Sequence, residues 1–236
     1  MIDKAPSPQP HAPEKELSSA YTKLITDSGQ LRRLLKGSDI VTNWSHRKEY
    51  VWSWWEKGRK PIAGIIDQLT DAEKETVSVF DYGCANGFLL RSLQEWSTHE
   101  IEPYGFDLKK ERITAARELF PTQHKQFTND KRELHTFPAS FDFVYWNLWD
   151  NWKLHSEEQI HQLHELFNRV TPGGYLVVGL YDHRQAQRRG KLERLAELGF
   201  IPSGIEESSS GNETFAWFKR PAPLPPELEI AVDNYR

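Results

Sequence analysis

The spacing of hydrophobic residues changes near residue 72 of this chain. Before that point, apolar residues recur every three or four positions, which predicts a helical segment over residues 16–70. We expect Pro61 to open a separate short helix within this segment, because proline is favoured in the first turn of a helix. Residues 1–15 are polar and rich in proline, which predicts a flexible N-terminal lead.

Beyond residue 72, short apolar runs alternate with amphipathic stretches. The runs predict strands at 77–81, 101–106, 126–128, 141–146, 175–180, 200–206 and 213–219. The amphipathic stretches predict helices at 87–96, 109–120, 157–170 and 187–198. This alternation predicts an α/β fold whose parallel sheet is covered by helices on both faces. The last two strands predict an antiparallel hairpin, and residues 221–236 form a Pro-rich, then acidic tail.

The composition excludes several classes of protein. With 27% charged and 38% hydrophobic residues, the 236-residue chain suits a globular fold, and its net charge of −4 argues against a protein built mainly to bind nucleic acid. No apolar run approaches the roughly 20 residues that span a bilayer, and no apolar segment near the start predicts a secretory signal. The single cysteine, Cys84, excludes an internal disulfide and a multi-cysteine metal site. We therefore expect no metal, no membrane and a cytoplasmic location.

The segment 81–87 connects the first expected β-strand to a helix. Gly83 and Gly87 allow a tight turn and a close approach of the backbone to a ligand, and the helix N-terminus offers free N–H groups. Asp81 ends the strand, and its carboxylate would repel the pyrophosphate of a dinucleotide. A cationic ligand without phosphate fits better, and S-adenosylmethionine, which has an ammonium and a sulfonium, is such a ligand.

Asp107 lies directly after the second β-strand. An acidic side chain at that position can accept hydrogen bonds from both hydroxyls of a ribose. The alternative is that Asp107 simply caps the helix that follows, and the two roles are compatible.

These residues resemble the motifs of class I S-adenosylmethionine-dependent methyltransferases. Residues 81–87 are similar to the first motif of that family, Asp107 matches its ribose-binding acid, and residues 171–178 resemble its Pro-Gly-Gly turn before the fifth strand. The resemblance implies a Rossmann-like, doubly wound, mostly parallel seven-stranded sheet with a C-terminal antiparallel hairpin. It assigns residues 72–220 to the methyltransferase domain, behind a helical cap at 16–70.

The resemblance also implies roles for single residues. The backbone of the first motif should follow the methionyl part of the cofactor, Asp81 should orient its amino group, and Leu108 should contact the adenine. Ala85 stands where the family often has glycine, and its methyl group is tolerable if φ is negative there. The expected cofactor-binding residues are Asp81, Gly83, Cys84, Ala85, Gly87, Asp107, Leu108, Asn129, Asp130 and Asn147.

The acceptor side of the site is less well defined. Methyl transfer is an in-line displacement in which the protein mainly aligns the acceptor, and the sequence singles out no catalytic residue. We expect Tyr50 and Trp149 to contact the substrate, and at least one of Trp44, Tyr50 and Trp55 to face the pocket, although such residues often pack in a core. The candidates for a general base, each with a structural role as the favoured alternative, are His46, Tyr145, Asp150, His155, Asp182 and His183.

Three functions therefore compete. We favour methyl transfer to a small organic acceptor, at an oxygen, nitrogen or carbon atom. Asn147 lacks the following Pro-Pro that amino-group methyltransferases acting on adenine or glutamine often have, which argues against base methylation. Basic stretches at 23–60 and 184–194 favour the alternative of an RNA or other nucleic-acid methyltransferase. A non-catalytic module that binds S-adenosylmethionine is the third reading, and the sequence does not indicate the oligomeric state.

Overall fold

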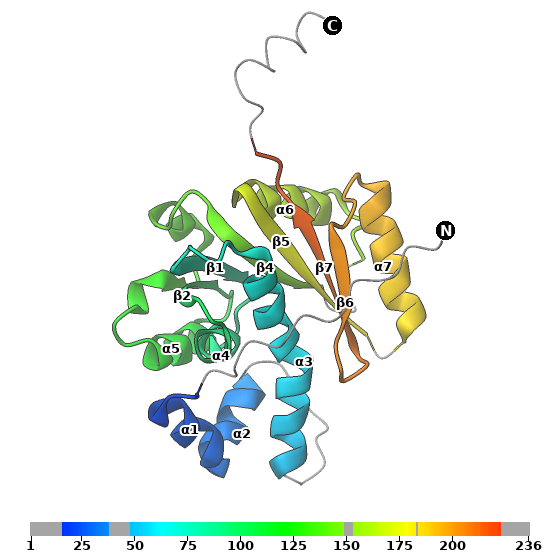
Figure 1. Ribbon diagram of the computed structural model, residues 1–236. Coiled ribbons are helices and arrows are strands. Elements are labelled where there is room, and N and C mark those ends of the chain that lie inside the picture. The colour runs from blue at the N-terminus through cyan, green and yellow to red at the C-terminus, as the bar shows by residue number, and fades with distance from the viewer. Residues whose placement is uncertain (1–15, 38–47, 149–152, 183, 223–236) are drawn as a thin grey trace, which may run out of the picture.

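A computed structural model describes residues 16–37, 48–148, 153–182 and 184–222. Its seven strands form one sheet in the order β3-β2-β1-β4-β5-β7-β6 (Figure 1). Strands β1 to β5 run parallel to one another, whereas β7 is antiparallel to both β5 and β6. The predicted fold, a mostly parallel seven-stranded sheet that ends in an antiparallel hairpin, is confirmed.

The strands are β1 (Thr76–Tyr82), β2 (Glu100–Phe106), β3 (Phe127–Thr128), β4 (Phe141–Leu148), β5 (Val170–Tyr181), β6 (Gly204–Glu207) and β7 (Glu213–Lys219). The α-helices are α1 (Ser19–Thr26), α2 (Ser28–Gly37), α3 (Lys48–Leu69), α4 (Phe88–Trp96), α5 (Lys110–Leu119), α6 (Glu157–Asn168) and α7 (Gln185–Glu197). Two 3-10 helices, η1 (His124–Gln126) and η2 (Lys131–Thr136), flank β3.

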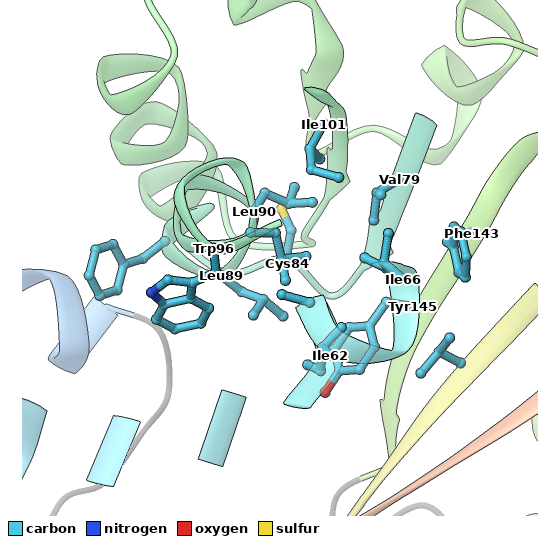
Figure 2. Close-up of a cluster of buried hydrophobic side chains, with 14 of the residues drawn as sticks. Ile62, Ile66, Val79, Cys84, Leu89, Leu90, Trp96, Ile101, Phe143 and Tyr145 are labelled. Atoms are coloured by element: carbon cyan, nitrogen blue, oxygen red, sulfur yellow. The ribbon is translucent and has the colours of Figure 1, made fainter. Parts of the chain in front are cut away.

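The sheet separates two hydrophobic cores. Successive residues of a strand point to opposite faces, so Val79 of β1 packs in one core and Phe80 in the other. On the first face, α3 lays Ile62 and Ile66 against the sheet, and Figure 2 shows both beside Tyr145 of β4. Helices α6 and α7 supply the second core, on the opposite face.

Helix α3 is continuous through Pro61, so the prediction of a separate helix after this proline was wrong. Proline lacks the N–H that would donate to the carbonyl four residues earlier, which is Lys57 O. In this fold the Ser209 hydroxyl, from the β6–β7 turn, donates to Lys57 O at 3.1 Å. The freed carbonyl is therefore satisfied by a distant part of the chain, which sequence spacing does not reveal.

Strand β5 is longer than expected because it includes the Pro-Gly-Gly segment. Between Phe141 and Phe143 of β4, the partner strand advances from Val170 to Tyr175, so the segment forms a bulge rather than a turn before the strand. Gly173 adopts φ +88° in this bulge, and its N–H donates to Arg220 O at 2.8 Å.

The strand order reverses between β1 and β4, since β2 lies on one side of β1 and β4 on the other. Open α/β sheets bind ligands at the carboxyl ends of the strands beside this reversal. Helices α1 and α2 lie at the same end of the molecule as the β6–β7 turn, which marks the carboxyl ends of β4 and β5 (Figure 1). The N-terminal helices thus border the edge at which a ligand is expected.

Candidate active site

The loop between β1 and α4 is tied to the neighbouring strand. The N–H groups of Gly83 and Cys84 both donate to Phe106 O, at 2.7 and 2.9 Å. Gly83 has φ +92°, is exposed, and has open space where a side chain would lie. Gly87 has φ +74°, and an added Cβ would come within 3.2 Å of Phe120. The two glycines therefore have different surroundings. Gly83 faces open space, whereas Gly87 packs closely against the core.

Cys84 stabilises the loop through its buried side chain and its backbone carbonyl. Its thiol lies in the core, where an added Cβ on Gly105 would approach Sγ to 2.7 Å, and burial raises the pKa of the thiol. Its carbonyl accepts the N–H of Gly87 at 2.9 Å. Cys84 thus shapes the loop from the inside.

Ala85 adopts φ +51°, so the condition named above for tolerating its methyl group, a negative φ, is not met. A left-handed conformation costs a non-glycine residue roughly 1–2 kcal/mol. The Ala85 N–H donates to Oδ2 of Asp107 at 3.1 Å, which holds the backbone in this conformation. The loop therefore keeps the glycine-like geometry of the motif without the glycine.

Asp107 connects the loop to the start of α5. It is only 6% exposed, and its Oδ1 accepts the Lys109 N–H at 2.9 Å. Arg112 donates to Oδ2 at 3.3 Å, beside the bond from Ala85. The next residue, Leu108, is 73% exposed, an unusual position for a large apolar side chain. Asp107 thus bonds to the backbone just before α5 but does not cap the helix, because the N-cap residue is Lys109 and it has no side-chain capping bond.

Asp81 lies in the same neighbourhood as Asp107. It is 4% exposed, and burial raises its pKa to about 8, with a further increase from the Asp107 carboxylate and a decrease from Arg59. The same two carboxyl groups both raise the pKa of Cys84, which lies in the loop between them. The structure therefore brings the two expected acids together at the carboxyl ends of β1 and β2.

The two residues after β3 differ in their surroundings. Asp130 caps η2 by accepting the Arg132 N–H at 2.9 Å, and the Arg132 guanidinium lowers the pKa of the Asp130 carboxyl to about 2. Asn129 is half-buried, and no described residue forms a hydrogen bond with its side chain. Of the two, Asn129 is the residue whose side chain is available to a ligand.

Beside the Asp81 loop, four polar side chains meet at the carboxyl ends of the central strands. We call them the edge cluster: Arg59, Tyr145, Asn147 and Glu213. Arg59 forms an ion pair with Oε2 of Glu213, and Asn147 Nδ2 donates to Oε1 of the same carboxylate at 3.0 Å and to the Tyr145 hydroxyl at 3.3 Å. Arg59 is 4% exposed and Glu213 is 1% exposed.

The edge cluster depends on a glycine in β5. An added Cβ on Gly179 would lie 2.5 Å from the Tyr145 hydroxyl and 3.2 Å from Oε1 of Glu213. A side chain at this position would therefore displace one or both groups, so the space for the cluster is built into the sheet.

A comparison with known protein families identifies the family of this chain. The Methyltransferase domain family matches residues 73–214, which is more than half of the chain. The chain belongs to the class I S-adenosylmethionine-dependent methyltransferases. S-adenosylmethionine is therefore the cofactor of this methyltransferase.

Solved structures share the fold at low identity. The magnesium protoporphyrin IX methyltransferase from Synechocystis PCC 6803, solved with bound SAM, gives a TM-score of 0.54 at 15% identity, over 86% of this chain and 96% of its own. The cyclase SpnF gives 0.55 at 14% identity, over 86% and 95%. A SAM dependent methyltransferase from Aquifex aeolicus gives 0.50 at 18% identity, over 69% and 90%. No match is found among curated proteins.

The base candidates of the methyltransferase separate into three groups. Burial raises the pKa of Tyr145 well above 10, although Arg59 opposes this shift, so the hydroxyl stays protonated at neutral pH and cannot act as a base. Asp182 is buried with Oδ1 accepting the Arg184 N–H at 2.8 Å, and His155 is exposed. The candidates outside the described residues are His46, Asp150 and His183.

The aromatic residues expected at the substrate pocket divide similarly. Trp55 is fully buried, stacks on Phe88 and donates to Ser92 Oγ at 3.3 Å, so it belongs to the core rather than to the pocket. The residues Trp44 and Trp149, and the side chain of Tyr50, lie outside what the structure describes.

Three cations of the second basic stretch are directed inward, whereas Arg184 and Arg189 are exposed. Arg188 donates to Asp182 O at 2.6 Å and to Thr214 Oγ1 at 2.9 Å. Lys191 donates to Leu148 O at 2.8 Å, and Arg194 donates to Leu154 O at 3.0 Å. These three cations stabilise strand ends and loops and are not arranged to follow a phosphate backbone.

Sequence analysis missed Arg59 and Glu213. A signal for Arg59 was available, because Trp55, Arg59, Ile62 and Ile66 share the helical spacing of a buried face, and a charged residue there indicates a buried partner. Glu213 begins an apolar strand and carried no comparable signal.

Three further observations limit the site. A surface hollow lined by Glu56, Lys57, Lys60, Pro61 and Ser209 is open and contains none of the expected cofactor-binding residues. In the described part of the chain, no three His, Cys, Asp or Glu residues are grouped to hold a metal ion. None of the described helices is both long and apolar enough to cross a membrane.

Proposed function

We propose that this methyltransferase transfers a methyl group to a small organic acceptor at the carboxyl ends of β4 and β5, beside Asn147. The supporting observation is that the carboxyl ends of β4 and β5 are enclosed by other parts of the chain. Of the edge cluster there, Arg59, Tyr145 and Glu213 are buried and Asn147 is half-buried, and Arg59 of α3 pairs across the cluster with Glu213. A buried reacting position admits a small molecule more easily than an intact polymer.

The cofactor is proposed to lie across the ends of β1 and β2, where the side chains suit its charge and shape. Asp81 would pair with the ammonium, Asp107 would accept from the ribose hydroxyls, and Leu108 would cover the adenine. The exposed Gly83 would let the backbone approach the methionyl part, and Asn129 would face the adenine edge. S-adenosylmethionine supplies the electrophilic methyl group, and the chain contributes binding, orientation and exclusion of water.

Calorimetry with S-adenosylhomocysteine tests the cofactor assignment. Because a hydrogen bond to a charged group contributes about 1.5–3 kcal/mol, Asp107→Ala is expected to weaken binding by roughly tenfold to a hundredfold. Asp142→Ala, at the opposite end of β4 and bonded to Ser78 at 2.9 Å, is the matched carboxylate control and is expected to leave affinity unchanged. Unchanged affinity in a folded Asp107 variant would remove the ribose assignment.

A second matched pair tests the adenine contact. Leu108 and Ile201 are large apolar residues with similar exposure, but only Leu108 follows Asp107. Leu108→Ala is expected to weaken binding several-fold, and Ile201→Ala to have no effect. Equal effects in both variants would contradict the proposed position of the adenine.

Turnover tests the class of acceptor. The full chain is incubated with S-adenosylmethionine and either the small-molecule fraction or the macromolecular fraction of a cell extract. Formation of S-adenosylhomocysteine is expected with the small-molecule fraction. Turnover confined to the RNA-containing fraction would reject a small acceptor and favour nucleic-acid methylation.

A further inference from the structure

The surface hollow beside α3 joins two segments that are far apart in the sequence. Its lining residues are Glu56, Lys57, Lys60 and Pro61 of α3 and Ser209 of the β6–β7 turn, and its volume is about 480 Å³. The Ser209 hydroxyl donates to Lys57 O at 3.1 Å, so the two segments are in contact, in agreement with their positions in Figure 1. Small-molecule sites occupy about 300–1,000 Å³, so the hollow has room for a small ligand.

The hollow carries positive charge that the described residues do not neutralise. Its lining contributes two ammonium groups and one carboxylate, although the whole chain has a net charge of −4. Lys57 is exposed, and its ammonium forms no ion pair or hydrogen bond with a described residue. Lys60 Nζ lies 3.8 Å from Oε1 of Glu56, and the two side chains are 42% and 37% exposed. An exposed pair at this distance contributes little to stability, so a ligand anion can replace Glu56.

The β6–β7 turn supplies neutral donors next to these charges. The Gly211 N–H donates to Ser208 O at 2.9 Å and closes the turn. The backbone N–H groups of the two residues between them, Ser209 and Ser210, form no hydrogen bond with a described residue. Successive N–H groups in a turn form a concave site for an anion. The turn and the two lysines therefore offer donors of the kind from which a phosphate accepts.

We propose that the hollow binds the phosphate group of a small phosphorylated molecule. A phosphate dianion balances the charges of Lys57 and Lys60, and its oxygens can also accept from the N–H groups of the turn. A carboxylate has one charge and two oxygens, so it satisfies fewer of these donors. Glu56 then exchanges its partner Lys60 for water. This site is independent of the function proposed above, because no residue of the hollow is assigned to the cofactor or to the acceptor.

The same two segments carry the buried ion pair of the edge cluster. Arg59 precedes Lys60 on α3, and its partner Glu213 begins β7, directly after the turn. A phosphate that bridges α3 and the turn therefore holds together the two segments that the ion pair joins. Bound phosphate is expected to raise the melting temperature, since a ligand that binds only the folded chain stabilises it.

Titration with inorganic phosphate tests the site. The ¹⁵N-labelled full chain is titrated at constant ionic strength, with phosphate replacing sodium chloride, so that screening does not change. Saturable shifts are expected at the amide resonances of Ser209 and Ser210, together with the rise in melting temperature. The absence of a saturable shift at these amides would overturn the proposal.

Two double variants with the same change in charge test the lysines. Lys57→Gln/Lys60→Gln is expected to weaken phosphate binding by about tenfold or more, because each ammonium contributes a charge-assisted hydrogen bond. The control, Lys110→Gln/Lys125→Gln, removes the same charge from two exposed lysines outside the hollow and is expected to keep the wild-type affinity. Equal Kd values in the two double variants would overturn the site.

A titration with acetate separates the two kinds of anion. Acetate is expected to bind several-fold more weakly than phosphate, since a carboxylate satisfies fewer of the donors. An acetate Kd equal to or below that of phosphate would overturn the phosphate assignment. None of these measurements depends on methyl transfer, so their failure leaves the proposed function intact, and a failure of turnover with the small-molecule fraction leaves this site intact.

Discussion

The two halves of the carboxyl edge of this methyltransferase are built in different ways. The half proposed to bind the cofactor, called the cofactor half, consists of two short continuous segments, the loop after β1 and the residues after β2. The half proposed to bind the acceptor, called the acceptor half, joins α3, β4 and β7, and its ion pair links residues 154 positions apart. The comparison teaches that a local backbone motif can carry one binding function, while its neighbour exists only after the chain has folded.

Arg59 is the residue that joins these halves. It forms an ion pair with Glu213 in the acceptor half, and its charge lowers the pKa of Asp81 in the cofactor half. Its guanidinium lies 5.8 Å from the centre of the Trp55 ring, which anchors it to the core of α3 and α4. Changes at Arg59 are therefore expected to affect both halves.

Arg59→Met should produce the largest change in stability. The substitution leaves Glu213 as a buried charge without its partner, which typically costs 3–5 kcal/mol. Urea denaturation followed by circular dichroism measures the loss. Arg59→Met/Glu213→Gln should recover most of it, because both charges are then absent, and a single variant as stable as the wild type would show that the pair is not buried in solution.

The pH dependence of the stability of the chain tests the environment of Asp81 in the cofactor half. The pKa of Asp81 is raised to about 8 in the folded chain, against about 3.9 in an unfolded one. The contribution of Asp81 is therefore complete below pH 4 and is lost as the pH rises toward 8, by at most about 1.4 kcal/mol per pH unit. Asp81→Asn should flatten this slope in melting experiments between pH 5 and pH 8.

Cofactor affinity should change with pH in the opposite direction. Pairing with an ammonium requires the ionised form of Asp81, so binding of S-adenosylhomocysteine should strengthen as the pH rises toward 8, by at most about tenfold per pH unit. An affinity that is independent of pH in the wild type, or a slope retained in Asp81→Asn, would assign the effect to another group.

Two substitutions in the loop after β1 should change the stability of the chain in opposite directions. Gly87→Ala places a methyl group at φ +74° and 3.1 Å from Ala116, which should cost about 1–2 kcal/mol for the backbone and more for the crowding. Ala85→Gly relieves a left-handed alanine and should stabilise the chain by about 1 kcal/mol or less. Thermal melting of both variants checks the signs, and destabilisation by Ala85→Gly would contradict the strained geometry.

The smallest expected effect concerns α3. Ser209→Ala removes the donor to Lys57 O and should cost about 1 kcal/mol or less. In a Pro61→Ala background the new backbone N–H can bond to this carbonyl, so Ser209→Ala should then cost little. Equal costs in both backgrounds, measured by a double-mutant cycle, would refute the link between the proline and the β6–β7 turn.

Most of the fold could be predicted from the sequence because its signals are local. Apolar runs and amphipathic stretches reveal strands and helices, and their alternation gives the parallel sheet. The bulge in β5 and the unbroken α3 could not be predicted, since each depends on a distant partner: Arg220 for Gly173, and Ser209 for Lys57.

The candidate site follows the same division. Asp81 and Asp107 could be found from their positions at strand ends, and the fold places them together. The left-handed conformation of Ala85 could not be predicted, because it is held by a hydrogen bond to an oxygen of Asp107, 22 positions away. The role of Glu213 could not be predicted, because it depends on the pairing of β7 with β5, which places Glu213 opposite Tyr181.

The contact between α2 and the loop has a consequence for how the chain responds to its cofactor. Asn86 of the loop donates Nδ2 to Leu34 O at 2.8 Å, and Gly37 leaves room for this amide, since an added Cβ would lie 2.7 Å from it. A cofactor that orders the loop must then slow hydrogen exchange in α2. By thermodynamic reciprocity, anything that loosens the N-terminal helices weakens cofactor binding by the same factor.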